Sequence, residues 1–204
     1  MIQMQVLKSL FREFLKDEDA TLSAETAIIL PILLWAYGGM YVFWDAFKMQ
    51  NINVKSAYTI ADMLSREIVN ITPEYIDGMA AMHNFLNRDR YVTRLRVSVV
   101  GAQLDPISGN TEFVLCWSEA RGNGMERHTA ISDIEDRIPM MAVGTEVIVV
   151  ETEMDYVPLL RRPYGLDERT FTNFIPTRPR FNRGQVGFDD GSTVVNCLNP
   201  QLNT

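Results

Sequence analysis

The chain has 204 residues, of which 47% are hydrophobic and 22% are charged, and acidic residues outnumber basic residues by 26 to 19. This composition excludes a disordered chain, and the length provides for one membrane anchor and one modest domain. The net charge of −7 disfavours generic binding to nucleic acid, whose phosphates are also negative.

The most informative stretch is the uncharged run from Thr26 to Trp44. At a rise of about 1.5 Å per residue, a helix of this length spans roughly the 30 Å hydrocarbon core of a bilayer. Glu25 stands at the entrance of the run, where burial of its carboxylate costs several kcal/mol unless a partner neutralises it or the interface holds it. No second apolar run of comparable length occurs in the sequence, so a single-pass membrane helix is predicted.

The N-terminal segment before the run carries apolar side chains at helical spacing, with Lys8, Arg12 and Lys16 on the opposite face. It is either a cytoplasmic leader that lies on the membrane surface or an N-terminal tail. Because these basic residues precede the span and only Lys48 and Lys55 follow it closely, the charge bias predicts a cytoplasmic N-terminus. The bulk of the chain is then expected outside the cytoplasm.

A cleaved secretory signal is the main competing interpretation, because residues 36–38 have a small-x-small pattern. The apolar stretch is longer than a usual signal core and bulky residues continue past that site, which favours an uncleaved span. Pro31 lacks the N–H for a bond to Ala27, and Gly38 and Gly39 are a soft point in the helix. A bend or local melting is therefore expected in the span.

Beyond the span, the sequence predicts an α+β domain. The helical pattern continues without Gly or Pro to about residue 71, and Thr72 followed by Pro73 is expected to begin a second helix that extends to about Asn87. The predicted organisation is a cytoplasmic leader over residues 1–20, a transmembrane helix with its extension over 21–71, and a periplasmic α+β domain over 72–204.

Alternating apolar and polar residues predict three strands. The stretches Leu95–Val99 and Phe113–Ser118 flank a cluster of turn residues at Asp105–Asn110, which is typical of a hairpin. The stretch Glu146–Tyr156 is the third predicted strand. We expect a small antiparallel sheet packed on the long helix.

The remaining segments have weaker patterns. Ser132 is expected to cap a short helix through Arg137, and from Pro158 onward prolines and glycines predict a long irregular C-terminal loop region. Arginines and aromatic residues alternate in that region, either as an interaction surface for a partner or lipid headgroups, or as a solvated loop whose aromatic rings fix it to the sheet. The arginines of the candidate surface are Arg161, Arg162, Arg178, Arg180 and Arg183.

The two cysteines, Cys116 and Cys197, have no spacing typical of a metal site. In an oxidising compartment we expect them to form a disulfide, and the alternative is two unrelated buried thiols. Cys116 alternates with Phe113, Leu115 and Trp117, so the bridge is expected on the face of the sheet opposite these three side chains.

Motifs for catalysis are missing from the sequence. It contains no Gly-rich phosphate loop, zinc-ligand spacing or nucleophile elbow. His83 and His128 have no neighbouring nucleophile in sequence and are expected at the surface or half-buried. A chain that is not an enzyme and that uses no cofactor or metal is therefore predicted.

The run Asp17–Pro31, DEDATLSAETAIILP, joins the charged end of the leader to the apolar helix. It resembles the N-terminus of TadE/TadF-like pseudopilins, minor components of the Tad (type IVc, tight-adherence) pilus system of bacteria. The resemblance implies a prepilin-peptidase cut between Ala20 and Thr21, with Glu25 as the fifth mature residue and Pro31 at the proline position of the family. The chain departs from the family before the cut, where glycine is usual, and after the glutamate, where an aromatic residue is usual.

The resemblance implies a minor pilin or pseudopilin in the bacterial inner membrane that assembles through its helix and can enter an extracellular pilus. Its partners would be other pilins and pseudopilins, the prepilin peptidase, the inner-membrane assembly platform and membrane lipid. Glu25 would then neutralise the freed N-terminal amine of a neighbouring subunit. Two alternatives stay open: a permanently anchored periplasmic scaffold of the same machine, in which Ala20 is never cut, and a tethered enzyme or ligand sensor that uses the arginine-rich region.

Overall fold

The computed structural model describes residues 18–105, 109–160, 164–165, 167–181 and 186–197, with side chains from Ser23 onward. It forms two compact units. The first contains the chain up to Asp45 with the segment Leu159–Leu166, and the second contains Ala46–Pro158 and the chain from Asp167 onward. The division falls inside the long helix, whereas the sequence analysis divided the chain after residues 20 and 71.

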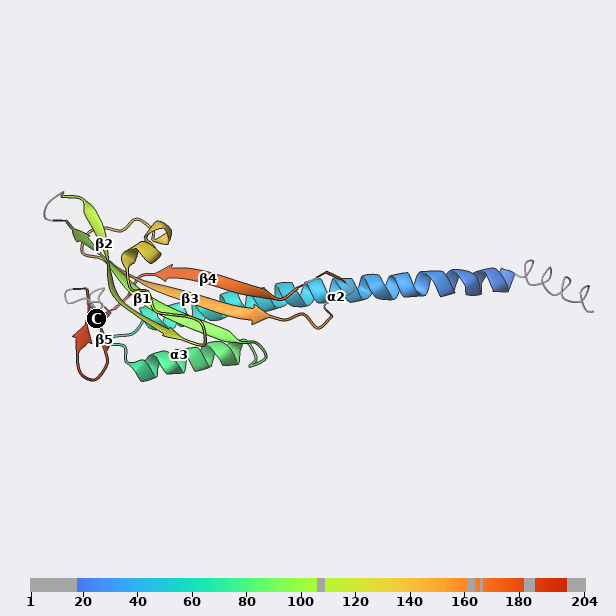
Figure 1. Ribbon diagram of the computed structural model, residues 1–204, viewed down its shortest axis with the longest axis horizontal. Helices are drawn as coiled ribbons and strands as arrows, with labels where there is room; N and C mark the ends of the chain where they lie inside the picture. Colours follow the sequence, from blue (N-terminus) through green and yellow to red (C-terminus); the bar gives the residue numbers. More distant parts are fainter. Residues whose placement is uncertain (1–17, 106–108, 161–163, 166, 182–185, 198–204) are drawn as a thin grey trace, which may run out of the picture. The chain divides into compact units, whose positions relative to one another are not determined.

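The long helix α2 covers Glu18–Ser65, 48 residues, with Pro31 inside it (Figure 1). Over this range the chain stays helical through Pro31 and through Gly38 and Gly39. Of the bend or local melting expected at these residues, the melting is therefore not found.

The C-terminal end of α2 corrects the predicted extension to residue 71. The amide of Arg66 donates to the carbonyl of Met63 at 3.1 Å, a three-residue bond that tightens the last turn. The chain then leaves the helical path, and the amide of Ile71 donates to the carbonyl of Gly187 at 2.8 Å. Pairing with a distant segment thus holds the chain in a non-helical path that the local pattern does not predict.

Helix α3 covers Pro73–Leu86, and its predicted start is confirmed. The Oγ1 atom of Thr72 accepts a hydrogen bond from the amide of Tyr75 at 3.3 Å. Pro73 occupies the first turn, where a helix has no intrahelical use for the missing N–H. The buried side chains of α3 are Ile76, Met79 and His83.

Four antiparallel strands form the sheet, in the spatial order β2-β1-β3-β4 (Figure 1). Their bounds are β1 Thr93–Leu104, β2 Thr111–Arg121, β3 Glu146–Tyr156 and β4 Arg169–Thr177. The hairpin of β1 and β2 and the strand β3 lie where the alternating pattern predicted them. The predicted α+β class is confirmed.

Strand β4 corrects the expectation of an irregular region from Pro158 onward. It pairs with β3 along its whole length, and Pro176 stands opposite Val149. Proline is tolerated there because β4 is an edge strand with a neighbour on one side only. A second small hairpin follows, formed by β5 (Phe188–Asp189) and β6 (Val194–Val195).

The connection between β2 and β3 contains two short 3₁₀ turns, η1 (Ile131–Asp133) and η2 (Glu135–Arg137). They replace the single short helix predicted through Arg137. Ser132 lies inside η1 and does not cap it. The carboxylate of Asp133 instead accepts bonds from the amides of Thr129 and Ala130, each at 3.3 Å.

One face of the sheet carries the main core together with side chains of α2 and α3. Core residues with 0% exposure include Ile60, Leu64, Ile76, Val97, Val99, Ile148 and Val150. A smaller apolar cluster is separate from this core, and its buried members are Val100, Ile134 and Ile138.

A β-bulge in β2 changes the side on which Cys116 lies. The register shifts between Val99, opposite Trp117, and Val100, opposite Leu115, so Cys116 is the extra residue. Cys116 and Trp117 both belong to the main core, whereas Leu115 packs against the smaller cluster. The prediction that Leu115 and Trp117 share a face opposite Cys116 is wrong, because the bulge interrupts the alternation.

Candidate functional site

The first unit exposes large apolar side chains all around the part of α2 from Ile28 to Trp35. A surface helix of a soluble protein has one apolar stripe and one polar face, but the consecutive residues Ile28–Leu30 and Ile32–Trp35 are all more than half exposed. Among the described residues, Ser23–Ser65 is the one helix long and apolar enough to cross a membrane. An apolar surface of this extent indicates a non-aqueous environment or a partner.

The residues of the pilin-like motif lie at the start of α2. Glu25 is exposed and has no hydrogen-bond or ion-pair partner among the described residues. Pro31 cannot donate to the carbonyl of Ala27, as expected for a proline inside a helix. Ala20 and Thr21 belong to the first turn of α2, and their side chains lie outside the described part.

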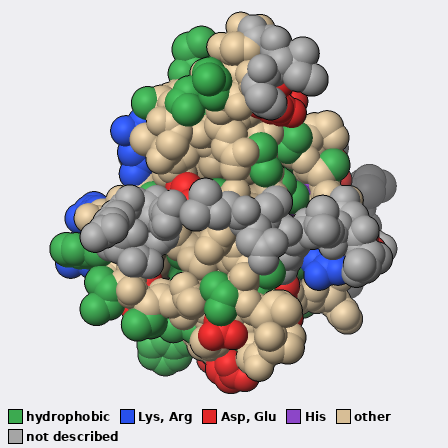
Figure 2. All heavy atoms as spheres, turned by 90° about the vertical axis from the view of Figure 1, so that its left-hand side faces the viewer, with side chains coloured by type: hydrophobic (Ala, Val, Ile, Leu, Met, Phe, Trp, Pro, Cys, Tyr) green, Lys and Arg blue, Asp and Glu red, His purple; other side chains and the backbone are tan. Residues whose placement is uncertain are grey.

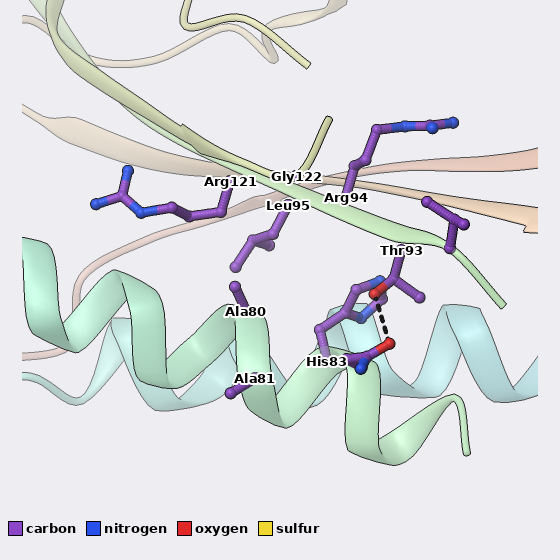
Figure 3. Close-up of a pocket in the computed structure, with 10 residues that line it drawn as sticks. Ala80, Ala81, His83, Thr93, Arg94, Leu95, Arg121 and Gly122 are labelled. Carbon is purple, nitrogen blue, oxygen red and sulfur yellow. Dashed lines mark hydrogen bonds between the residues drawn. The ribbon is translucent and has the colours of Figure 1, made fainter. Parts of the chain in front are cut away.

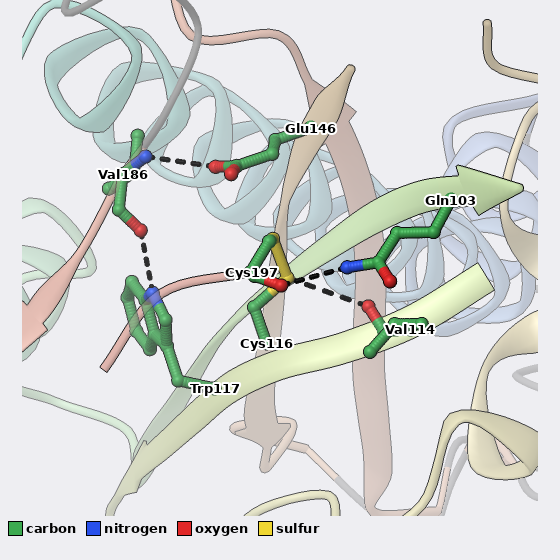
Figure 4. Close-up of a disulfide and its surroundings, with 7 residues drawn as sticks. All are labelled: Gln103, Val114, Cys116, Trp117, Glu146, Val186 and Cys197. Carbon is green, nitrogen blue, oxygen red and sulfur yellow. Dashed lines mark hydrogen bonds between the residues drawn. A yellow bond between two sulfur atoms is a disulfide. The ribbon is translucent and has the colours of Figure 1, made fainter. Parts of the chain in front are cut away.

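Cys116 and Cys197 form a disulfide that joins residues 81 positions apart, with Cα atoms 4.5 Å from each other (Figure 4). The bridge lies against Gly101 of β1, where a Cβ would come within 2.8 Å of the Sγ atom of Cys197. The Nε2 atom of Gln103 donates to the carbonyl of Cys197 at 2.8 Å. The pair expected from the sequence is the pair that the structure joins.

Two hydrogen bonds near the bridge attach the C-terminal segment to the sheet (Figure 4). The Nε1 atom of Trp117 donates to the carbonyl of Val186 at 2.8 Å, and the amide of Val186 donates to the Oε2 atom of Glu146 at 2.9 Å. Burial raises the pKa of Glu146, and the bond from Val186 offsets only part of this effect. The segment is thus held by β2 and β3 as well as by the disulfide.

Charged side chains of β1 and β3 pair across the sheet. Arg94 stands opposite Glu153, and its Nε atom donates to the Oε2 atom of Glu153 at 2.7 Å. The same guanidinium donates to both carboxylate oxygens of Asp155, at 2.7 and 2.9 Å. Arg96 stands opposite Glu151, and its Nε atom donates to Glu151 at 2.7 Å. Such opposite-charge pairs stabilise this register of the two strands.

Glu151 is the centre of the charged network and is 5% exposed. Besides the bond from Arg96, its carboxylate accepts bonds from the Nε2 atom of His128 at 2.6 Å and the Nη1 atom of Arg137 at 3.1 Å. Burial alone would raise the pKa of Glu151, but the bonds from His128 and Arg96 outweigh burial and lower the pKa to about 2. Glu151 therefore connects β3 with β1 and with the segment that contains η2.

This network was not predicted from the sequence. The alternating arginines of β1 and the alternating acidic residues of β3 are visible in the sequence, and pairing rules for adjacent strands could have matched them. His128 and Arg137 come from the irregular connection between β2 and β3, where no periodic pattern points to a partner.

A buried polar cluster contains side chains of α2 and α3. His83 is 0% exposed, so its expected surface or half-buried position is wrong, and its Nδ1 atom lies 2.7 Å from the Oγ atom of Ser56. The Nδ2 atom of Asn87 donates to the carbonyl of His83 at 2.9 Å. Burial lowers the pKa of His83 to about 4. Ser56 is 2% exposed, so both side chains of this serine and histidine pair are buried in the fold.

We expect acid to destabilise the protein through His83. Its pKa of about 4 in the fold lies below the ordinary 6.5, so its contribution to stability is complete above pH 6.5 and is lost as the pH falls from 6.5 to 4. At about 1.4 kcal/mol per pKa unit, the free energy of unfolding should fall by about 2–3 kcal/mol between pH 7 and pH 4.5. Urea unfolding of the detergent-solubilised chain measures this difference.

His83→Gln is the control for this pH dependence. Since glutamine does not titrate, this variant should lose about 2–3 kcal/mol less than the parent chain over the same pH interval. Equal losses in the parent and the variant would show that His83 is not the group that titrates.

A cleft of about 390 Å³ opens between α3 and the strands β1 and β2 (Figure 3). At its lining, the Oγ1 atom of Thr93 donates to the Oδ1 atom of Asn84 at 3.2 Å. Arg121 is paired with Asp77 and Glu119, and the other lining arginine belongs to the charged network. The described lining therefore offers no unpaired cation to an anionic ligand, and in the described chain no group of three or more His, Cys, Asp or Glu residues could hold a metal.

The structure assigns a structural role to one member of the candidate arginine surface. The amide of Arg180 donates to the carbonyl of Ser65 at 2.8 Å, and its guanidinium pairs with Asp62 at 3.2 Å, so a cation lies at the C-terminal end of α2. Arg178 is exposed. The other members lie outside the described residues: Arg161, Arg162 and Arg183. On the face in Figure 2, the described basic side chains form small separate groups among acidic and hydrophobic ones.

No model of a known protein family, no curated protein and no solved structure matches the chain. A functional assignment therefore depends on the N-terminal motif and on the architecture described above.

Proposed function

We propose that this chain is a minor pilin or pseudopilin-like subunit of a Tad (type IVc) pilus, anchored in the bacterial inner membrane, that acts by association and not by catalysis. The observation that carries the proposal is helix α2. Its stretch from Ile28 to Trp35 is apolar all around and exposed, and its part after Asp45 supplies core residues to an α+β unit. The motif at Asp17–Pro31 adds a candidate prepilin-peptidase site at the start of the same helix.

Glu25 supplies the electrostatic part of the proposed assembly. A cut between Ala20 and Thr21 frees a positively charged amine, and the Glu25 carboxylate of a neighbouring subunit neutralises it inside an apolar bundle of helices. An unpaired amine or carboxylate there would cost several kcal/mol. Since Glu25 has no partner among the described residues, its carboxylate is available for this pairing.

The disulfide supports a periplasmic position for the second unit. Disulfides persist in the periplasm and are rare in the cytosol, and the bridge of Cys116 with Cys197 lies in this unit. A periplasmic unit agrees with a cytoplasmic leader that contains Lys8, Arg12 and Lys16. The prepilin peptidase and the inner-membrane assembly platform would then contact the chain at the membrane, and other pilins and pseudopilins would contact α2.

Replacement of Glu25 by glutamine tests the proposal. Glutamine keeps the size of the side chain but not its charge, so the freed amine of the neighbouring subunit stays unmatched. We expect Glu25→Gln protein to insert, to keep its folded second unit and to be cut, but to be lost from sheared pilus fractions. N-terminal sequencing of the membrane-extracted protein records whether Thr21 is the new first residue.

Glu135→Gln is the matched control, because Glu135 is an exposed glutamate of η2 in the second unit. This variant should enter the pilus fraction like the parent chain. Normal assembly of Glu25→Gln would refute the charge pairing. A parent chain that keeps its leader would support the alternative of a permanently anchored scaffold instead.

A further inference from the structure

Tyr164, in the segment Leu159–Leu166, packs against α2 within the first unit. Its ring centroid lies 5.7 Å from that of Trp35. A Cβ on Gly39 would come within 3.1 Å of the Tyr164 ring, and a Cβ on Gly38 would overlap with the Tyr164 hydroxyl. The two glycines therefore provide a flat site on which the ring lies, in place of the soft point expected from the sequence.

This ring lies inside the apolar run and not beyond its end. Gly39 precedes Trp44, the last residue of the run, by roughly 7–8 Å along the helix axis at about 1.5 Å per residue. The polar layer on each side of the hydrocarbon core is roughly 5–8 Å thick. In a helix whose run fills the hydrocarbon core, Tyr164 therefore lies roughly 7–8 Å below the boundary with the headgroups, among the upper acyl chains.

The same segment exposes two leucines next to each other. Leu159 is 64% exposed and Leu160 is 40% exposed. A shallow apolar cleft of about 320 Å³ is lined by Tyr164 and by α2 residues that include Trp35, Met40 and Phe43. The first unit thus exposes apolar side chains of this segment as well as those of the helix.

We infer that Leu159, Leu160 and Tyr164 form a second contact with the lipid bilayer, which we call the interfacial loop. The inference rests on the proposed membrane anchorage of α2. Lipid is the partner because the loop is continuous with the part of α2 that lipid already surrounds. The Tyr164 ring is apolar and lies at Gly39, and its hydroxyl lies at Gly38. A second contact of this kind restricts the tilt and rotation of the span.

Depth-dependent fluorescence quenching tests the interfacial loop in the full chain, reconstituted in vesicles of phosphatidylethanolamine and phosphatidylglycerol. Because Cys116 and Cys197 are joined, a thiol-reactive fluorophore without reductant labels only an introduced cysteine, and the parent chain serves as the labelling blank. Leu159→Cys reports the loop, Leu33→Cys reports the middle of the span, and Met140→Cys reports a residue 97% exposed in the second unit.

We expect a probe at Leu159 to lose more emission to a spin label near the headgroup end of the acyl chain than to one near the methyl end. At Leu33 the order should reverse, and at Met140 only aqueous iodide should quench. Lipid quenching at Leu33 combined with full iodide access at Leu159 would overturn the interfacial loop and leave the anchor intact. Absence of lipid quenching at Leu33 would overturn both the anchor and the loop.

Gly38→Leu provides a second test, because its side chain fills the site of the Tyr164 ring. We expect this variant to reduce lipid quenching and to increase iodide quenching at the Leu159 probe, with no change at the Leu33 probe. Gly78→Leu is the matched control, since a Cβ at Gly78 of α3 meets nothing within 4 Å. An unchanged Leu159 probe in Gly38→Leu protein would contradict the role of the glycines in holding the loop at the bilayer.

Discussion

Replacing Glu151 by alanine is expected to lower the free energy of unfolding by about 3–5 kcal/mol, the usual cost of removing one partner from a buried ion pair. The substitution removes the carboxylate that accepts bonds from Arg96 and His128. The interactions in the fold lower the pKa of Glu151 from the ordinary 4.5 to about 2. At about 1.4 kcal/mol per pKa unit, this shift corresponds to roughly 3 kcal/mol, which agrees with the expected loss of stability. This contribution is complete above pH 4.5 and is lost as the pH falls from 4.5 to 2.

Glu153→Ala is the matched control for Glu151→Ala. Glu153 also pairs with an arginine of β1, but its side chain is 32% exposed and Arg94 keeps its bonds to Asp155. We expect this variant to lose only about 0–1 kcal/mol. Urea unfolding of the detergent-solubilised chain at pH 7, followed by circular dichroism, measures both variants. Equal losses would contradict the central position of Glu151 in the network.

Removal of the disulfide is expected to lower the free energy of unfolding by up to about 4–5 kcal/mol in the chain-entropy account. The bridge closes a loop between residues 81 positions apart, so its loss gives the unfolded chain many more conformations. Cys116 and Cys197 are 0% and 7% exposed. A double substitution, Cys116→Ala with Cys197→Ala, therefore avoids the added cost of a buried hydroxyl.

Unfolding with and without reductant separates the stability contributed by the disulfide bond from the effect of the two alanine substitutions. In reductant, the parent chain should become about as unstable as the double alanine variant, and the variant should not respond to reductant. Two freely alkylatable thiols in parent protein isolated from the periplasmic side without reductant would refute the pairing. A parent chain whose stability is independent of reductant would refute the energetic role of the bridge.

Sequence patterns predicted the elements whose determinants are consecutive residues. Thr72 and Pro73 define the start of α3 within two positions. The alternation in Glu146–Tyr156 defines β3, and the uncharged run defines the apolar part of α2. In each case the information for capping, alternation or length is local, so no tertiary contact is needed to interpret it.

The features that sequence analysis missed depend on distant partners. Strand β4 contains Pro176 and many polar residues, and it is a strand because β3 lies beside it. The bulge at Cys116 exists because two residues of β2 stand opposite one residue of β1. The chain between α2 and α3 leaves the helical path where Ile71 pairs with Gly187. Local propensity does not contain this information.

The candidate functional residues divide in the same way. Glu25 and Pro31 were predicted as assembly residues from their positions in the motif. The pairing of the two cysteines was predicted from their number and from the expected compartment. Two other contacts join residues far apart in the chain. Glu151 accepts a hydrogen bond from His128, and Tyr164 packs against Gly38 and Gly39 of α2. No spacing rule relates those residues.

The disulfide also determines what a protease can remove from the subunit. Because β3 and β4 lie between Cys116 and Cys197, a single cut anywhere in that interval gives two fragments that stay covalently joined. The fragment with α2 also carries Cys116, so the C-terminal fragment is retained on it. The same cut in a chain without the bridge leaves the C-terminal fragment held by noncovalent contacts alone. A nicked subunit therefore keeps every described strand attached to its helix.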